Sequence, residues 1–260
     1  MVELEHTQAL LEQMGLNTAA QLLDAQLEIS LHKQQTYLQF LHELLSSEQQ
    51  QRQQKSLETR LKLARLPHRK GLDEFDFEFQ PSIDKRQIEE LGTLAFVGRA
   101  ENVIFLWPPG VGKTHMAVGL ALKALQAGMV VYYTTLSRLI ADLKKAQTQG
   151  NLERRWRIYL RPALLVIDEV GYMQLNRQEA ELLLRLISER YEHGSVILTS
   201  NKYFSDWGEL LSDSILATAL LDRLLHHSHV VNIRGQTYRL RERMKAGVQP
   251  VPPTNLPADG

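Results

Sequence analysis

The chain of 260 residues contains no cysteine, which excludes disulfide bonds, thiolate catalysis and cysteine-ligated zinc. Its nine histidines are scattered without the spacing of a metal site, so no structural metal is expected. No apolar run approaches the roughly 20 residues that a membrane-spanning helix needs. The N-terminus carries Glu3 and Glu5 where a signal peptide needs positive charge. We therefore expect a cytoplasmic protein that does not associate with membranes.

The chain also lacks net charge, because 30 lysines and arginines balance 30 aspartates and glutamates. This balance argues against a protein that binds nucleic acid by bulk charge alone, although local basic patches remain possible. The 43% hydrophobic and 23% charged residues are ordinary for a globular protein. The length fits one sizeable α/β domain with a smaller addition.

Between Thr7 and Leu66 there is no proline, and Gly15 is the only glycine. Apolar residues recur at helical spacing in this stretch, as in Tyr37, Phe40, Leu41, Leu44 and Leu45. The pattern predicts a small all-α domain over residues 1–66.

A linker is predicted over residues 67–85, where Pro67 and Gly71 interrupt the helical pattern. Three phenylalanines alternate with acidic residues there, at Phe75, Phe77 and Phe79. Because acids separate the rings, we interpret them as packing against the next domain rather than as stacking on bases, and assign them no chemistry.

Strands and helices alternate in the rest of the chain, which predicts a parallel sheet covered by helices on both faces in a domain over residues 86–243. Five short apolar runs are the predicted strands, at Asn102–Leu106, Met129–Thr134, Ala163–Ile167, Ser195–Thr199 and His229–Ile233. The tail over residues 244–260 is predicted to be disordered, because four of its last thirteen residues are proline.

The first predicted strand runs into a loop typical of phosphate binding. Backbone N–H groups of such a loop and of the following helix point at the anion, while Lys113 neutralises phosphate oxygens and the Thr114 hydroxyl binds Mg2+. The predicted ATP-contacting residues are Pro108, Pro109, Gly110, Val111, Gly112, Lys113, Thr114 and His115. The alternative is a chance Gly-Lys-Thr turn.

One position departs from the usual phosphate-loop pattern. Trp107 stands where the pattern has its first glycine, five residues before Gly112. A side chain at this position either shifts the loop entry and crowds the nucleotide, or points into the sheet and leaves the cradle intact.

Two acids follow the third predicted strand directly, at Asp168 and Glu169. Asp168 would hold the Mg2+ shell through water, and Glu169 would orient and deprotonate the attacking water. The strand Met129–Thr134 lies between this motif and the phosphate loop, which suits the branch of P-loop ATPases with an extra strand and a catalytic glutamate. The alternative is a pair of solvated acids at a strand end.

Two further residues are candidates for catalysis. Asn201 follows the fourth predicted strand and would sense the γ-phosphate, unless it only caps the next turn. Arg223 lies on an amphipathic helix before the last strand and could reach the ATP of a neighbouring subunit. Alone, such an arginine is more often solvated or salt-bridged.

Over about residues 8–243 the sequence resembles the IstB ATPases, which are transposition helper proteins encoded by bacterial insertion sequences beside their transposase. The motifs that carry the resemblance are Phe75-Asp76-Phe77, Arg99–Val103, Pro108–His115, Ile167–Tyr172, Ile187–Glu192, Thr199–Asn201, Ala219–His227 and Ile233–Gly235.

The resemblance implies an AAA+ fold related to the helicase loader DnaC and the initiator DnaA. It also implies ATP-dependent homo-oligomerisation on duplex DNA, with an IstA-type transposase as partner. By the same resemblance Asp168 and Glu169 are the metal and water acids, Asn201 the sensor and Arg223 the arginine that acts in trans. Since only about twenty proline-rich residues follow Leu240, no full C-terminal lid is expected. Contacts to the far side of the nucleotide would then come from the linker or a neighbouring protomer.

Two basic clusters are candidates for duplex DNA. Residues 52–70 hold seven basic residues against one acid, a net charge of +6, and include Lys62 and Arg65. The second cluster lies between the second and third predicted strands and includes Lys144, Lys145, Arg154 and Arg155. In related initiators and loaders this second segment faces the central channel of the assembly, which makes Arg154 and Arg155 the first choice for phosphate contacts and Lys62 and Arg65 the second. Solvated or paired basic residues are the alternative for each cluster.

Three functions remain open at this stage. The first is an ATP-driven transposition helper, and the second is a DnaC-type loader of a replicative helicase. The third is a nucleotide-gated scaffold in which Trp107 impairs hydrolysis.

Overall fold

The computed structural model describes residues 2–106, 108–234 and 237–238. Two compact units make up the chain, with the division between Lys62 and Leu63. Trp107 and the proline-rich segment from residue 244 lie outside the described residues. The residues after Leu240, from which we predicted that no full lid is present, also lie outside them. The finer division, with a linker over 67–85, stays a prediction.

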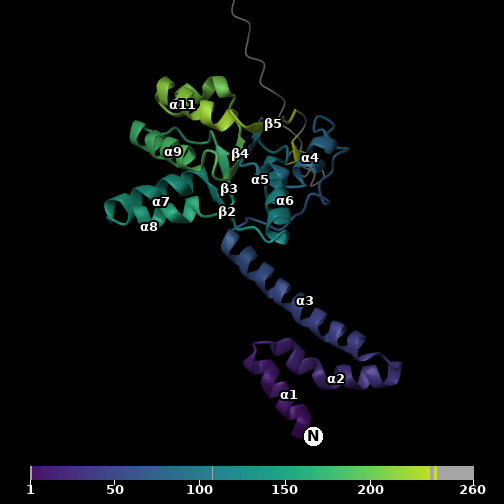
Figure 1. Ribbon diagram of the computed structural model, residues 1–260. Coiled ribbons are helices and arrows are strands. Elements are labelled where there is room, and N and C mark those ends of the chain that lie inside the picture. The colour runs from purple at the N-terminus through teal and green to yellow at the C-terminus, as the bar shows by residue number, and fades with distance from the viewer. Residues whose placement is uncertain (1, 107, 235–236, 239–260) are drawn as a thin grey trace, which may run out of the picture. The chain divides into compact units, whose positions relative to one another are not determined.

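The N-terminal unit is helical, as predicted (Figure 1). It contains α1 (Val2–Gln13), α2 (Asn17–Lys33) and most of α3 (Tyr37–Ala64). Its small core consists of Ala19, Leu23 and Leu44 with partly buried neighbours. Glu48 of α3 accepts hydrogen bonds from the backbone N–H groups of Thr18 and Ala19, at 2.7 and 3.0 Å. These bonds satisfy amides at the start of α2 that have no partner within the helix.

The second unit is built on a five-stranded parallel sheet with the order β2-β3-β4-β1-β5, which confirms the predicted fold class. The strands are β1 (Asn102–Leu106), β2 (Val131–Thr135), β3 (Leu164–Val170), β4 (Ser195–Ser200) and β5 (Ser228–Asn232). Each lies within three residues of its predicted position. The largest difference is in β3, which continues through both acids instead of ending before them.

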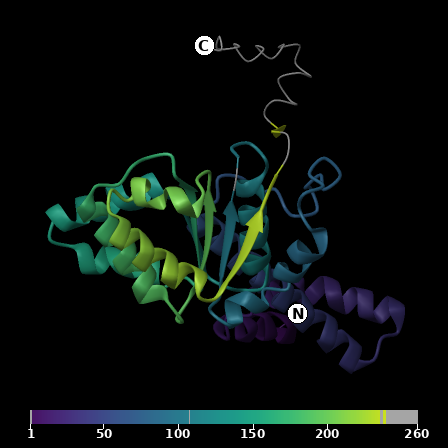
Figure 2. The same ribbon diagram turned by 90° about the horizontal axis from the view of Figure 1, so that it is seen from above.

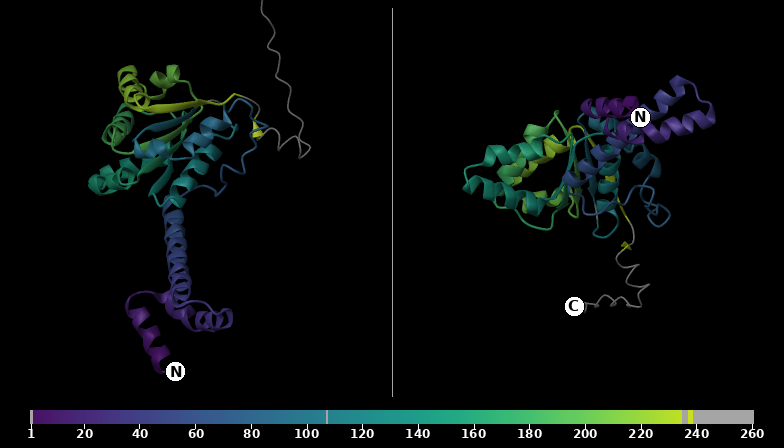
Figure 3. Two further views of the ribbon diagram at one scale, coloured as in Figure 1. Left: turned by 45° about the vertical axis from the view of Figure 1, so that its right-hand side comes forward. Right: turned by 90° about the horizontal axis from the view of Figure 1, so that it is seen from below.

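Helices cover both faces of this sheet, as Figure 2 and Figure 3 show from further directions. On one side lie α4 (Lys85–Leu91), α5 (Ala95–Gly98) and α6 (Lys113–Gln126). On the other side lie α7 (Leu136–Thr148), α8 (Leu152–Leu160), α9 (Arg177–Arg190) and α11 (Ser214–Leu225). A 3-10 turn (Phe204–Asp206) and α10 (Trp207–Leu210) precede α11. Burial on both faces explains why the central strands are almost wholly apolar.

The strand order sets the place of the candidate site. β4 lies between β1 and β3, so one strand separates the phosphate-loop strand from the acidic strand in the sheet, whereas β2, which lies between the two motifs in the sequence, is at the sheet edge. All five strands are parallel, and their carboxyl ends therefore meet at one edge of the sheet. Within the described residues, no helix is long and apolar enough to cross a membrane.

Candidate functional site

The loop after β1 forms an anion cradle. Gly110 and Gly112 have φ angles of 85° and 100°, in the left-handed region that favours glycine. A Cβ atom on Gly112 would lie 2.5 Å from Cε2 of Phe75, so a side chain there has no room. Helix α6 begins at Lys113, which directs its first N–H groups and the positive end of its dipole toward the loop.

The remaining predicted loop residues are divided between packing and the site. Val111 is fully buried, and Pro108 and Pro109 are more exposed. Lys113 is also buried, and its Nζ atom donates a hydrogen bond to the carbonyl oxygen of Pro108 at 2.7 Å. His115 forms a 2.7 Å hydrogen bond through Nε2 with the carbonyl oxygen of Gly71. The ammonium group of Lys113 therefore lies at the loop where it is predicted to neutralise phosphate oxygens.

Asp168 lies buried beside this loop and accepts hydrogen bonds from three hydroxyl groups. The Thr114 hydroxyl lies 3.1 and 3.0 Å from its two carboxylate oxygens, and Tyr133 donates to Oδ2 at 2.5 Å. Thr199 donates to Oδ1. Burial and the negative charge of Asp168 raise the pKa of the Tyr133 phenol, which therefore stays a neutral donor. The sequence had placed Thr114 beside Asp168 but had identified neither Tyr133 nor Thr199.

Glu169 differs from its neighbour in exposure and in backbone conformation. Its side chain is exposed and its φ angle is 63°, which is unusual for a residue other than glycine. The pairing of β3 with β4 shifts register between Ile167 and Val170, which indicates a bulge at the acids. The Glu169 N–H donates to the Thr199 hydroxyl at 3.1 Å. Bulges next to active sites commonly redirect a side chain, and this one separates two consecutive acids into different surroundings.

Asn201 follows β4 and contributes an amide to the same edge. Its Oδ1 atom is buried and has no hydrogen-bond partner among the described residues. The next turn is instead made by Ser200, whose hydroxyl accepts from the Lys202 N–H at 3.0 Å. The capping role that the sequence left open for Asn201 is thus taken by Ser200. A buried amide oxygen without a partner is costly in a dry interior and indicates a place for a ligand or water.

These groups line one cavity of about 450 Å3, a size typical of ligand sites. The predicted residues on its wall are Gly110, Gly112, Lys113, Thr114, His115, Asp168, Glu169 and Asn201. The wall also includes residues from the stretch before α4 and from the end of the described chain: His68, Lys70, Glu74, Phe75, Asp76 and Tyr238.

One of the three phenylalanines between positions 67 and 85 has a place at the cavity as well as in the packing. Phe75 is buried and packs edge-on against His115 and Tyr238, at centroid distances of 5.3 and 5.7 Å, as the packing interpretation expected. Phe75 also lines the cavity, so the interpretation of this ring as packing alone was incomplete. Sequence reasoning expected linker contacts near the nucleotide but had no signal to single out this ring.

Arg223 of α11 is half-buried, and its Nη1 atom donates to the carbonyl oxygen of Ala219 at 2.8 Å. It is not among the residues that line the cavity of its own chain. A role for Arg223 toward this chain's own ligand is therefore not indicated by the structure.

The predicted DNA-contacting residues lie in different environments. Arg155 pairs with Asp142 at 2.5 Å, and Lys144 pairs with Glu179 at 2.7 Å. Arg154 is exposed on α8, and Lys145 borders a small hollow beside Asp142. In the other cluster Lys62 is exposed on α3, and the guanidinium of Arg65 lies 5.7 Å from the centre of the Tyr132 ring.

The residues present fit ATP with Mg2+. A glycine-rich loop at a helix N-terminus, with a buried lysine, suits a polyphosphate. The Thr114 hydroxyl and the Asp168 carboxylate, 3.0 Å apart at their nearest atoms, supply the oxygen ligands that Mg2+ prefers. The strand order and this site define a P-loop ATP-binding protein of the AAA+ class.

Comparison with solved structures supports the fold. The AMPPCP-bound DnaA of Aquifex aeolicus superposes with a TM-score of 0.54 at 16% identity, over 72% of this chain and 59% of that one. The DnaI structure gives a TM-score of 0.53 at 17% identity, over 65% of this chain and 90% of that one. At such identities the likeness concerns the fold alone.

The chain belongs to the family of IstB-like ATP binding proteins, whose pattern matches residues 9–246. It is 50% identical to the insertion sequence IS21 ATP-binding protein of Pseudomonas aeruginosa, over 95% of this chain and 92% of that one. It is 48% identical to the IS5376 ATP-binding protein of Geobacillus stearothermophilus, over 80% and 83% of the two chains. The resemblance found in the sequence is thereby confirmed.

Proposed function

We propose that the protein hydrolyses ATP at this cavity, with the phosphates on the loop and Mg2+ held between Thr114 and Asp168. The observation that carries the proposal is the contact between these two side chains, which lie 54 residues apart and meet at 3.0 and 3.1 Å. One comes from the phosphate loop and the other from the acidic strand, and a P-loop ATPase needs both.

The chain's own residues divide the chemistry. Lys113 would exchange the Pro108 carbonyl for phosphate oxygens and offset their charge. Glu169, exposed at the cavity wall, would orient the attacking water and take its proton. The Asn201 amide would contact the γ-phosphate or this water. Bound Mg2+ would supply further charge neutralisation to the β- and γ-phosphates.

We propose that hydrolysis depends on assembly of several subunits. Arg223 does not line the cavity of its own chain, which supports a role toward the ATP of a neighbouring subunit. An arginine supplied in trans stabilises the charge that develops in the transition state. ATP bound at one subunit would then favour a homo-oligomer in which each site is completed by the next chain.

We further propose that the assembly forms on duplex DNA and recruits or stimulates an IstA-type transposase. The support comes from the relatives, which are ATP-binding proteins of insertion sequences. The same relatives favour this function over that of a helicase loader. Exposed Arg154 is the first candidate for phosphate contacts, whereas Arg155 must first leave Asp142.

ATP turnover measured with and without duplex DNA tests the proposal. A DNA-stimulated rate that needs Mg2+ and rises further with the transposase supports the ATP-driven helper. ATP binding and DNA binding without turnover under any of these conditions would instead establish the nucleotide-gated scaffold. Stimulation by a replicative helicase and not by the transposase would favour the loader.

A further inference from the structure

Asp168 accepts hydrogen bonds from three hydroxyl groups in addition to its proposed role toward the metal. The residue is 3% exposed, and the three hydroxyl groups donate to its two oxygens. They come from three separate elements: Thr114 from α6, Tyr133 from β2 and Thr199 from β4. A buried carboxylate is costly unless its lone pairs are satisfied, and these hydroxyls satisfy them and fix the orientation of the group.

The three hydroxyls are not equivalent once Mg2+ is considered. Thr114 is the proposed metal ligand, so its oxygen would bind Mg2+ through a lone pair while its hydrogen is donated to Asp168. Neither Tyr133 nor Thr199 is a proposed metal ligand. The Thr199 hydroxyl has a further partner, because its oxygen accepts a hydrogen bond from the Glu169 N–H at 3.1 Å. Among the described residues, the Tyr133 hydroxyl hydrogen-bonds to Asp168 alone.

Position and burial make Tyr133 a rigid partner. It lies on β2, the strand that pairs with β3, and Thr135 of β2 is in register with Asp168. The residue is 5% exposed, and its hydroxyl lies 2.5 Å from Oδ2 of Asp168. A phenol held by a strand loses little conformational freedom when it orients a carboxylate.

We propose that Tyr133 is a positioning residue for the metal site, which holds Asp168 in the orientation that binds Mg2+. Thr199 assists from the opposite strand and joins the same network to Glu169. Residues that hydrogen-bond to a metal ligand orient it, and their removal typically weakens metal affinity by roughly 10–100-fold. The inference rests on the proposed use of Asp168 as a metal ligand, but not on hydrolysis.

The test compares Tyr133→Phe with the intact chain by two binding measurements. The affinity of Mn2+ for the protein saturated with a non-hydrolysable ATP analogue is followed by electron paramagnetic resonance. The affinity for the analogue alone is measured in EDTA. We expect Mn2+ to bind roughly 10-fold more weakly to the variant, with analogue affinity in EDTA unchanged. Hydrolysis, where present, should recover toward the parent rate at high Mg2+.

Tyr132→Phe is the matched control, since it removes the neighbouring phenol on the same strand. Tyr132 faces elsewhere, with its ring edge-on to Tyr159 at a centroid distance of 5.5 Å. This control should leave Mn2+ affinity unchanged. An equal loss in both variants, or a loss of analogue affinity in EDTA, would show that packing and not orientation of Asp168 is responsible.

Thr199→Ser and Thr199→Ala provide an independent pair if Tyr133→Phe disturbs folding, as judged by its melting temperature. The serine keeps the hydroxyl and should bind Mn2+ like the parent, whereas the alanine should bind it more weakly. Unchanged Mn2+ affinity in a folded Tyr133→Phe variant overturns the proposal, and so does unchanged affinity in Thr199→Ala where Tyr133→Phe does not fold. Absent turnover in the intact chain, with normal Mn2+ binding, would contradict the proposed function and leave this inference standing.

Discussion

Asp168 and Glu169 are consecutive acids with opposite surroundings. Asp168 is 3% exposed and surrounded by hydroxyls, while Glu169 is exposed and has a positive φ angle. A regular strand would send their side chains to opposite faces of the sheet. The bulge between Ile167 and Val170 interrupts that alternation, and both acids line the cavity at the same edge of the sheet. The proposed division into a metal ligand and a water-activating residue rests on this backbone feature.

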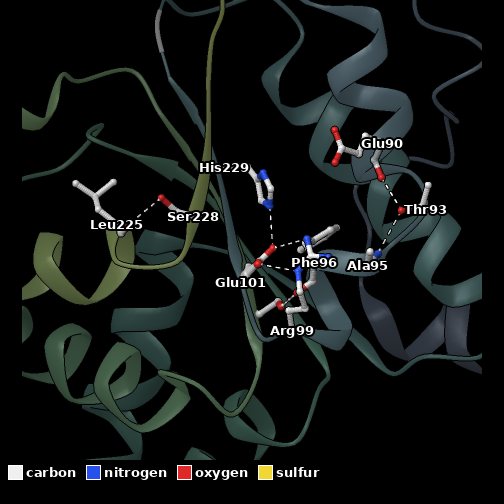
Figure 4. A network of polar contacts seen from close by, with 10 residues as sticks. Glu90, Thr93, Ala95, Phe96, Arg99, Glu101, Leu225, Ser228 and His229 are labelled. Atoms are coloured by element: carbon white, nitrogen blue, oxygen red, sulfur yellow. Dashed lines mark hydrogen bonds and ion pairs between the residues drawn. The ribbon is translucent and has the colours of Figure 1, made fainter.

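Another acid, Glu101, has a strongly perturbed pKa outside the candidate site (Figure 4). Arg99 donates two hydrogen bonds to it at 2.7 and 2.8 Å, and His229 lies 2.9 Å away. The hydrogen bonds from Arg99 and His229 lower its pKa from 4.5 to about 2. Its carboxylate therefore joins the start of β1 to the start of β5.

Glu101→Gln should destabilise the fold by about 1 kcal/mol at pH 7, a value at the upper end for partly exposed ion pairs. Because the folded pKa is the lower one, the contribution of Glu101 is complete above pH 4.5. It is lost as the pH falls toward about 2. Urea unfolding at pH 7 and pH 3 measures the difference between variant and parent, which should shrink at pH 3. A difference that stays constant with pH would contradict the assignment.

Glu89→Gln is the control for this experiment. Glu89 pairs with Lys85 at 3.7 Å, and both side chains are 64% exposed. Removal of such an exposed pair should change the free energy of unfolding little at either pH.

Helix α9 ends in a buried arginine that joins several elements. Arg190 is 2% exposed and donates to the carbonyl oxygens of Tyr159, Pro162 and Ser195, at 2.8 to 3.0 Å. Burial lowers its pKa to about 10, so it remains charged at neutral pH. These bonds connect the end of α8, the approach to β3 and the start of β4.

Arg190→Met should destabilise the protein by at least about 3 kcal/mol, because several buried carbonyl oxygens lose their donors together. Urea unfolding at pH 7 measures the change. Arg177→Met at the exposed start of the same helix should change stability by less than about 0.5 kcal/mol. Similar effects of the two substitutions would show that the Arg190 bonds are not important for stability.

Helix α8 carries the first candidate for DNA contacts. Arg154→Ala should weaken binding to all duplexes and reduce the slope of log affinity against log salt by roughly 0.9 for one lost phosphate contact. ATP binding should be unaffected. Adding Arg155→Ala should have a smaller effect, since Arg155 is already paired with Asp142. Fluorescence anisotropy with labelled duplexes over a range of salt measures both quantities.

Arg177→Ala, which removes an exposed arginine from α9, is the control for the loss of one positive charge. Unchanged affinity and salt slope in Arg154→Ala would move the proposed DNA site to the basic residues between positions 52 and 70.

The sequence was enough to predict the sheet and to find the glycines, lysine and threonine typical of a phosphate loop. Apolar runs and their spacing located the five strands, because strands buried on both faces exclude polar residues. Contacts made across the fold could not be predicted in the same way. Tyr133 meets Asp168 through strand pairing, and Phe75 reaches Gly112 from a segment before the sheet. Neither contact leaves a local pattern in the sequence.

The assembled protein should share each ATP site between subunits. Arg223→Ala should bind ATP nearly normally and lose assembly-dependent hydrolysis, because its own cavity remains complete. Mixing it with Lys113→Ala, which should not bind ATP, forms some interfaces with an intact cavity and an intact arginine. Turnover measured across mixing ratios should show partial recovery. No recovery at any ratio would count against a role in trans.

The most direct test of the ATPase assignment compares Glu169→Gln with the parent chain in ATP binding and in hydrolysis on duplex DNA. The substitution keeps the size of the side chain and removes the base that would take the water proton. We predict unchanged ATP affinity, a loss of hydrolysis of at least about 100-fold and longer-lived assemblies on DNA. Equal hydrolysis rates in Glu169→Gln and the parent would contradict the central claim.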